Sequence, residues 1–300
     1  MEISEVRDGI HMIDTRQMGH EAHTAVFVVE ADRTAVVETG LSTSRDRVLD
    51  GLDALGVARS DVDVILPTHV HLDHAGGAGF LADACPNATL VVPEPGLPFL
   101  TDADMAEKLV ASVHRAVGGM AEDYGTVRTV DDGRARGIAP GDTVDLGSRA
   151  LDVVAAPGHA PHQVALHDDA TDALFVADEA GMQLHGRLHV TSPPPDFDAD
   201  AILASLERFS DRDPDALIYT HYGVREDVAA ALEEYRRLLT DWVDAIARAA
   251  DECDDREAVI ERFVDPDHHY FAIWGETAAR ETLRMDVEGV LRYLGAFEEA

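Results

Sequence analysis

The run Thr68-His69-Val70-His71-Leu72-Asp73-His74 places three histidines and one aspartate within six residues. Neutral imidazole nitrogens and carboxylate oxygens suit zinc and similar divalent ions. An apolar segment, residues 62–66, comes just before and stops at Pro67, which predicts a short buried strand followed by a loop. Because alternate side chains of extended backbone point the same way, the first two histidines are expected to face one metal. The aspartate and the third histidine lie past the turn and are expected to face a second.

Later segments repeat this arrangement of an apolar strand followed by a polar loop. Pro157-Gly158-His159 follows the segment 151–155, Asp178 follows the segment 173–177, and His221 follows the segment 216–219. Together with T-H-V-H-L-D-H, this order resembles the metallo-β-lactamase superfamily, whose signature is H-x-H-x-D-H. The match is most similar to the glyoxalase-II-like branch of binuclear hydrolases. It departs from the pattern where Ala177 stands in place of the usual glycine.

The resemblance implies a binuclear centre with seven protein ligands. They are His69, His71 and His159 for one ion, Asp73, His74 and His221 for the other, and Asp178 as a bridge between the two. Two Zn²⁺ ions are the expected cofactors, with iron or manganese left open. Two such ions share a water and lower its pKa toward about 7. The implied reaction is attack of this hydroxide on a small thioester or ester carbonyl, with Asp73 orienting it.

Three further polar residues lie next to these motifs. Glu38 occupies the place of the aspartate in the superfamily's D-T-G motif, where that aspartate braces the metal loop. His162 follows the Pro-Gly-His motif and is expected to contact substrate or to brace the loop. Glu179 competes with Asp178 for the bridging role, but its side chain is expected to point elsewhere and to have no role at the metals.

The predicted fold is α/β, a four-layer αββα sandwich with a C-terminal helical extension. Two series of strands, separated by amphipathic helices, end in the ligand loops. Residues 1–223 are predicted to form the catalytic domain. Residues 224–300 have a 3.6-residue apolar period and are predicted to form helices packed on it. Residues 126–142 are expected to be a loosely ordered connection, and residues 182–197 show no clear period.

The formal net charge of −34 comes from 58 acidic residues against 24 basic ones, and Lys108 is the only lysine. Charge this strong is tolerated where salt screens it, so the composition is typical of a halophilic protein; an acidic face for a cationic partner is the alternative. No cluster of basic residues suited to phosphate contacts is present, so nucleic acid is not an expected partner.

Two cysteines, Cys85 and Cys253, make neither a disulfide framework nor a Cys-x-x-Cys metal site. No secretory signal opens the chain, and no apolar run reaches about 18 residues. We therefore expect a cytoplasmic protein that acts on a small molecule, away from membranes. The C-terminal helices are expected to pack on the domain, to close the site or to form a homodimer.

Three functions stay open. The first is hydrolysis of thioesters or small esters, similar to that of a hydroxyacylglutathione hydrolase. The second is a mononuclear iron persulfide dioxygenase, whose family shares H-x-H-x-D-H. The third is a non-catalytic binding protein of the same fold. The chain is too short for the flavin domain of the oxygen-reducing flavo-diiron proteins.

Overall fold

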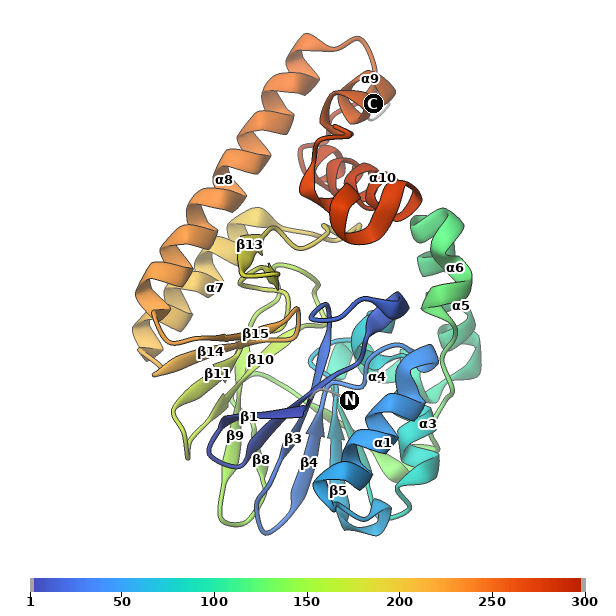
Figure 1. Cartoon of the computed structure of the whole chain (residues 1–300), viewed down its shortest axis with the longest axis vertical. Coiled ribbons are helices and arrows are strands. Elements are labelled where there is room, and N and C mark those ends of the chain that lie inside the picture. Colours follow the sequence, from blue (N-terminus) through green and yellow to red (C-terminus); the bar gives the residue numbers. More distant parts are fainter. Residues whose placement is uncertain (1–2, 298–300) are drawn as a thin grey trace.

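The computed structural model describes residues 3–297 of the chain. It is an αββα sandwich in which two mixed β-sheets pack face to face and helices cover the outer faces (Figure 1). The predicted fold class is therefore confirmed. The chain passes from one of these sheets to the other only once, so the first half of the sequence builds one sheet and the second half builds the other.

The first sheet has seven strands in sequence order. They are β1 (Ile3–Arg7), β2 (Ile10–Asp14), β3 (Ala25–Val29), β4 (Thr34–Val37), β5 (Val62–Leu66), β6 (Thr89–Pro93) and β7 (Ala135–Ile138). Strands β1 to β4 pair antiparallel, whereas β4 to β7 pair parallel. Parallel neighbours need long crossovers, and the helices of this half of the chain lie in those connections.

The second sheet has six strands in the order β15-β14-β11-β10-β9-β8. They are β8 (Thr143–Asp145), β9 (Ala150–Ala155), β10 (Val164–Asp168), β11 (Ala173–Phe175), β14 (Ala216–Tyr219) and β15 (Gly223–Arg225). Only β11 and β14 pair parallel among them. A separate hairpin, β12 (Met182–Leu184) with β13 (Arg187–His189), lies between β11 and β14 in the chain.

Strand β3 shows why the sequence of the first sheet is so apolar. All five of its side chains are buried. Ala25, Phe27 and Val29 enter the core between the two sheets, whereas Val26 and Val28 enter the core beneath the outer helices. A strand covered on both faces needs a continuous apolar run rather than an alternating one.

In the part of the chain that the structure describes, ten α-helices surround the sheets. They are α1 (Arg45–Leu55), α2 (Leu72–Ala75), α3 (Ala78–Ala84), α4 (Leu97–Thr101), α5 (Ala103–Val117), α6 (Ala121–Tyr124), α7 (Ala199–Arg212), α8 (Val228–Glu252), α9 (Arg256–Phe263) and α10 (His269–Tyr293). Leucines and valines of α7, α8 and α10 join the outer face of the second sheet in one continuous core. Helix α8 leads away from the sheets, and α9 and α10 return toward α5 and α6 (Figure 1).

Three parts of the predicted secondary structure were wrong. Strand β7 lies in the segment expected to be loosely ordered; it is an edge strand with an exposed arginine, so it lacks the apolar run that marks a central strand. Hairpin β12–β13 lies where no period was visible, because each of its strands has three residues. Strand β15 pairs with β14, so the sheet continues through Arg225, past the point where helix was predicted to begin.

The C-terminal helices differ in detail from the prediction. His268 caps the start of α10, and its side chain accepts a hydrogen bond from the backbone N–H of Tyr270. Gly275 interrupts α10 with a φ of 77°, which divides it into two helical pieces. Among residues 3–297, no helix has the length and apolar character that crossing a membrane requires.

Candidate metal centre

Four loops meet at one edge of the sandwich, and each follows the carboxyl end of a strand. His69 follows β5, His159 follows β9, Asp178 follows β11 and His221 follows β14. Backbone hydrogen bonds tie the two sheets together here: the Val164 N–H donates to the Thr68 carbonyl over 3.1 Å, and the Ala25 N–H donates to the Thr220 carbonyl over 2.8 Å. All seven predicted ligand side chains are brought together at this edge.

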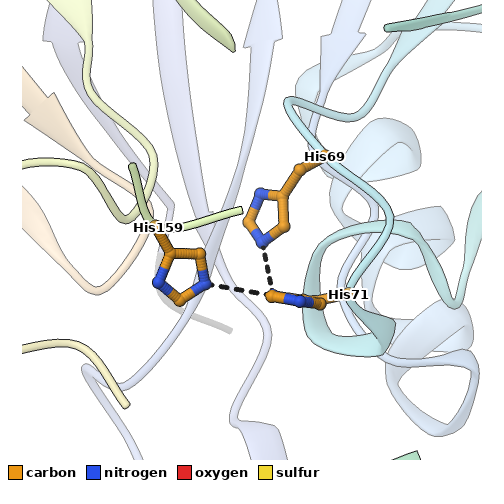
Figure 2. Close-up of side chains that lie close together, drawn as sticks. All are labelled: His69, His71 and His159. Atoms are coloured by element: carbon orange, nitrogen blue, oxygen red, sulfur yellow. Dashed lines mark hydrogen bonds between the residues drawn. The ribbon is translucent and has the colours of Figure 1, made fainter. Parts of the chain in front are cut away.

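The first group of nitrogens comes from His69, His71 and His159 (Figure 2). Nδ1 of His71 lies 3.0 Å from Nε2 of His69 and 3.0 Å from Nε2 of His159. Figure 2 shows the His69 and His159 rings each pointing a nitrogen toward the His71 ring, with His159 coming from the loop after β9. Burial lowers the pKa of His71 and of His159 to about 3, so both rings are neutral at pH 7. The neutral ring is the form that binds a metal ion.

The second group comes from Asp73, His74 and His221. Nε2 of His221 lies 3.5 Å from Oδ2 of Asp73, and Nε2 of His74 lies 3.9 Å from the same oxygen. The two histidines are buried, whereas the Asp73 side chain keeps 17% exposure and faces a cavity. The second group therefore has an open side where a small molecule can approach.

Asp178 spans the two groups with one oxygen toward each. Its Oδ2 lies 3.3 Å from Nε2 of His159, and its Oδ1 lies 3.3 Å from Nε2 of His74 and 3.4 Å from Nε2 of His221. Burial opposes ionisation of this carboxyl, but the surrounding histidines outweigh burial and lower its pKa. A buried, ionised carboxylate between two sets of nitrogens has the position that a bridging ligand requires.

Glu38 is fully buried and forms hydrogen bonds with these loops. Its carboxylate accepts hydrogen bonds from the Thr68 hydroxyl at 2.6 Å, from the Thr220 hydroxyl at 3.1 Å and from Nδ1 of His74 at 3.1 Å. The backbone of Glu38 has a φ of 65°, in the left-handed region that non-glycine residues rarely adopt. Glu38 thus occupies the bracing position expected from the sequence, with the longer side chain reaching two ligand loops at once.

The hydrogen bonds fix which nitrogen of each buried ring is free. Because Thr68 donates its proton to Glu38, Nδ1 of His69 must donate to the Thr68 oxygen 3.1 Å away. In the same way, Nδ1 of His74 donates to Glu38, and Nδ1 of His221 donates to the His23 carbonyl over 3.1 Å. The Nε2 atoms of all three rings then point toward each other and toward carboxylate oxygens. A donor set of this kind fits divalent cations, which bind imidazole nitrogens and carboxylate oxygens together.

Glu179 has a role that the sequence analysis missed. It is buried, and its carboxylate accepts hydrogen bonds from the backbone N–H groups of Gly158 and His159, both at 2.9 Å. The Gln163 amide donates to it over 2.9 Å, and the Ser205 hydroxyl also donates to it. Glu179 does point away from Asp178, as expected, but it holds the loop that carries His159. This positioning role was not foreseen from the sequence.

The surroundings of the centre also include His162, His23 and Trp274. The His162 ring lies 5.4 Å from the His71 ring and lines the cavity. The His23 ring lies 5.9 Å from the His221 ring and 5.2 Å from Trp274 of α10. His23 and Trp274 were not predicted, because nothing in their own sequence neighbourhoods marks them. Thr68 and Thr220 could have been found, since each directly precedes a predicted histidine ligand.

Comparison with known proteins agrees with this geometry. Residues 18–221 match the model of the metallo-beta-lactamase superfamily, which is more than half of the chain, so the chain belongs to that superfamily. A metallo-beta-lactamase fold-containing protein of Sulfurisphaera tokodaii, ST1585, is 27% identical over 220 residues, covering 72% of this chain and 79% of that protein.

Solved structures show the same fold. The crystal structure of ST1585 has a TM-score of 0.72 at 22% identity and covers 94% of this chain and 98% of its own. The metallo-beta-lactamase family protein TTHA1429 of Thermus thermophilus has a TM-score of 0.67 at 19% identity, with 96% and 93% covered. Both matches extend well beyond residue 221, so the fold they share includes part of the C-terminal helices.

Proposed function

We propose that this protein is a hydrolase of small thioesters or esters that uses two divalent metal ions, with zinc as the expected metal. The observation that carries the proposal is the position of Asp178, whose two oxygens face two separate groups of histidine nitrogens. His69, His71 and His159 would hold one ion. Asp73, His74 and His221 would hold the other. When bound, such ions polarise a carbonyl and lower the pKa of water to about 7.

The protein's own groups supply the remaining requirements of hydrolysis. The Asp73 side chain lines the cavity, so its carboxylate can orient an attacking water toward a carbonyl carbon. Glu38 and Glu179 hold the ligand loops by several hydrogen bonds each, so these side chains are positioned before substrate arrives. No serine or cysteine nucleophile is needed.

Metal analysis and a substrate screen test the proposal together. Protein purified without chelator should contain close to two equivalents of zinc, and it should hydrolyse simple thioesters at a rate that falls with chelation and returns with added metal. A single equivalent of iron together with oxygen uptake on a persulfide would replace the proposal by the dioxygenase reaction. Full metal content without turnover of any thioester, ester or lactone would indicate a binding protein.

A further inference from the structure

A cavity of about 660 Å³ lies directly over the candidate metal centre. His71, Asp73, His159, Asp178 and His221 form its floor. Its walls come from α5, α6, α10, the loop at residues 17–23 and the proline-rich segment 191–196. A volume of this size is typical of a site for one small molecule. Any substrate that reaches the metal centre from this side must fit against these walls.

The walls are rich in methionine. Five of the seven methionines of the chain line the cavity, namely Met18, Met105, Met120, Met182 and Met285. They come from five separate segments, so no helical period explains their meeting. Phe99, Leu109 and Val113 add further apolar surface. Unbranched, polarisable thioether side chains adapt to flexible apolar ligands, which is the use that proteins make of methionine at binding surfaces.

Three cations lie on the same cavity: Lys108 and Arg115 of α5, and Arg292 of α10. All three are exposed, whereas His159 and His221 of the floor are buried and His71 is half-buried, so the cations lie at the mouth of the cavity. Within residues 3–297, none of the three forms an ion pair or a side-chain hydrogen bond. By contrast, 13 of the 23 arginines form an ion pair with a carboxylate among the described residues.

Two carboxylates, Asp196 and Glu288, also line the cavity, and Arg284 lies 4.0 Å from Glu288. Away from the floor, the lining therefore has three cations and two anions, against 24 and 58 in the whole chain. The cavity mouth is thus locally depleted of negative charge. Unpaired cations at the mouth complement an anionic group, and a neutral ligand would leave them without a partner.

We propose that the substrate is an amphipathic anion: a thioester or ester with an extended apolar part that lies against the methionines and an anionic group at Lys108, Arg115 and Arg292. The inference rests on the proposed hydrolase function, because the scissile carbonyl is placed at the metal centre. The anionic group can belong to the acyl part or to the thiol part. An anionic group on either part would interact with the same three cations at the cavity mouth.

The apolar part is tested with thioesters of one neutral thiol, N-acetylcysteamine, whose acyl chains have two, four, six or eight carbons. Each added methylene should raise kcat/KM about fourfold until the cavity is filled. Met105→Gln keeps the side-chain length but adds polarity, and it should flatten this series. Leu294→Gln is the matched control, because Leu294 is an exposed apolar residue that does not line the cavity. An acetyl thioester hydrolysed as fast as the octanoyl thioester would overturn the proposal.

The anionic part is tested with two pairs of substrates at low salt. One pair has a carboxylate or its methyl ester at the end of the acyl chain, and the other has them at the end of the thiol. In at least one pair, the carboxylate substrate should have a kcat/KM about five times that of its methyl ester. Lys108→Gln combined with Arg115→Gln should bring that ratio close to one. Arg248→Gln, at an exposed arginine of α8 outside the cavity, should leave it unchanged. Equal rates within both pairs would contradict the assignment of the cations.

A binding measurement separates failure of this inference from failure of the proposed function. Metal-loaded protein is titrated with hexanoate and decanoate by calorimetry, which requires no turnover. Decanoate should bind more tightly by about fourfold per methylene, and the double variant Lys108→Gln/Arg115→Gln should weaken it about fivefold. If no thioester is hydrolysed but these results hold, the cavity assignment stands and the hydrolase proposal falls. Equal affinities for both acids, or unchanged affinity in the double variant, would refute the cavity assignment itself.

Discussion

Replacing Glu179 by glutamine removes one oxygen acceptor and adds an NH₂ group at the same place. Each carboxylate oxygen now accepts two hydrogen bonds, one from a backbone N–H and one from a side chain. In either orientation of the amide, the NH₂ group faces a backbone N–H of Gly158 or His159. Ser205 can rotate its hydroxyl and Gln163 can flip its amide to adapt, but the backbone donor cannot. One buried N–H therefore loses its acceptor.

The cost follows from these contacts. A buried donor without a partner costs about 1–3 kcal/mol, and the remaining backbone bond loses the charge assistance of a carboxylate, about 1 kcal/mol more. We expect Glu179→Gln to lower the free energy of unfolding by about 2–4 kcal/mol. Because the distorted loop carries His159, the affinity for the ion at the first group should fall about 10- to 100-fold. Metal at the second group should be less affected.

Both effects are measurable on purified protein in molar KCl. Chemical unfolding of the metal-free protein gives the stability, and competition with a chromogenic chelator gives the metal affinity. Glu207→Gln is the matched control, since Glu207 of α7 is 69% exposed and lies 3.8 Å from Arg236. A Glu179→Gln protein with the stability and both metal affinities of the wild type would refute the positioning role argued here. Loss of stability with unchanged metal affinity would refute the link to His159.

Three further predictions concern charge. Asp178→Asn keeps the size of the side chain but removes the charge between the two groups of histidines. Metal stoichiometry should therefore fall, and kcat should drop at least about 10²-fold. Two retained metals with wild-type rates would contradict this. The net charge of −34 implies self-repulsion at low ionic strength, so the thermal midpoint should rise from dilute buffer to molar KCl, and a flat response would refute a halophilic adaptation. Burial raises the pKa of Asp286 to about 7, above its unfolded value of 3.8, so the folded state holds this proton longer and stability should fall as pH rises from about 4 to 7. Between these pH values, the free energy of unfolding of Asp286→Asn should fall by up to about 4 kcal/mol less than that of the wild type. Identical pH profiles for the two proteins would show that Asp286 titrates normally.

The ligand residues were predictable because each lies directly after an apolar strand, where chain direction alone brings the loops to one edge. Glu38 was predictable for the same reason. Its contact with Thr220 was not, although Thr220 itself lies next to a predicted ligand, because the two residues are 182 apart in the sequence and meet only when the two sheets pack together. The positioning role of Glu179 was missed because its neighbour Asp178 carries the recognisable role. The three-dimensional position of Gly158, which Glu179 holds, is invisible in the sequence.

The cavity walls could not be predicted either. Helices α5 and α10 were expected from their apolar period, but period alone does not say which helix faces which. The five methionines lie between residues 18 and 285, and only the folded chain brings them around one space. The short strands β7, β12 and β15 were missed because strands of three or four residues are too short to show a clear alternation of apolar and polar side chains.

The contacts of Glu38, Thr24 and Thr220 have a consequence for how the protein folds. Thr24 lies 3.2 Å from Nδ1 of His221, a residue 197 positions away, and Glu38 joins β4 to the loop after β14. These contacts close loops of 197 and 182 residues, and closing a long loop costs entropy that local structure does not repay. During synthesis, the first half of the chain can form its own sheet well before His221 leaves the ribosome. The second candidate group of metal ligands is completed only at that late moment, so the proposed binding of two ions would report that the two halves have docked correctly.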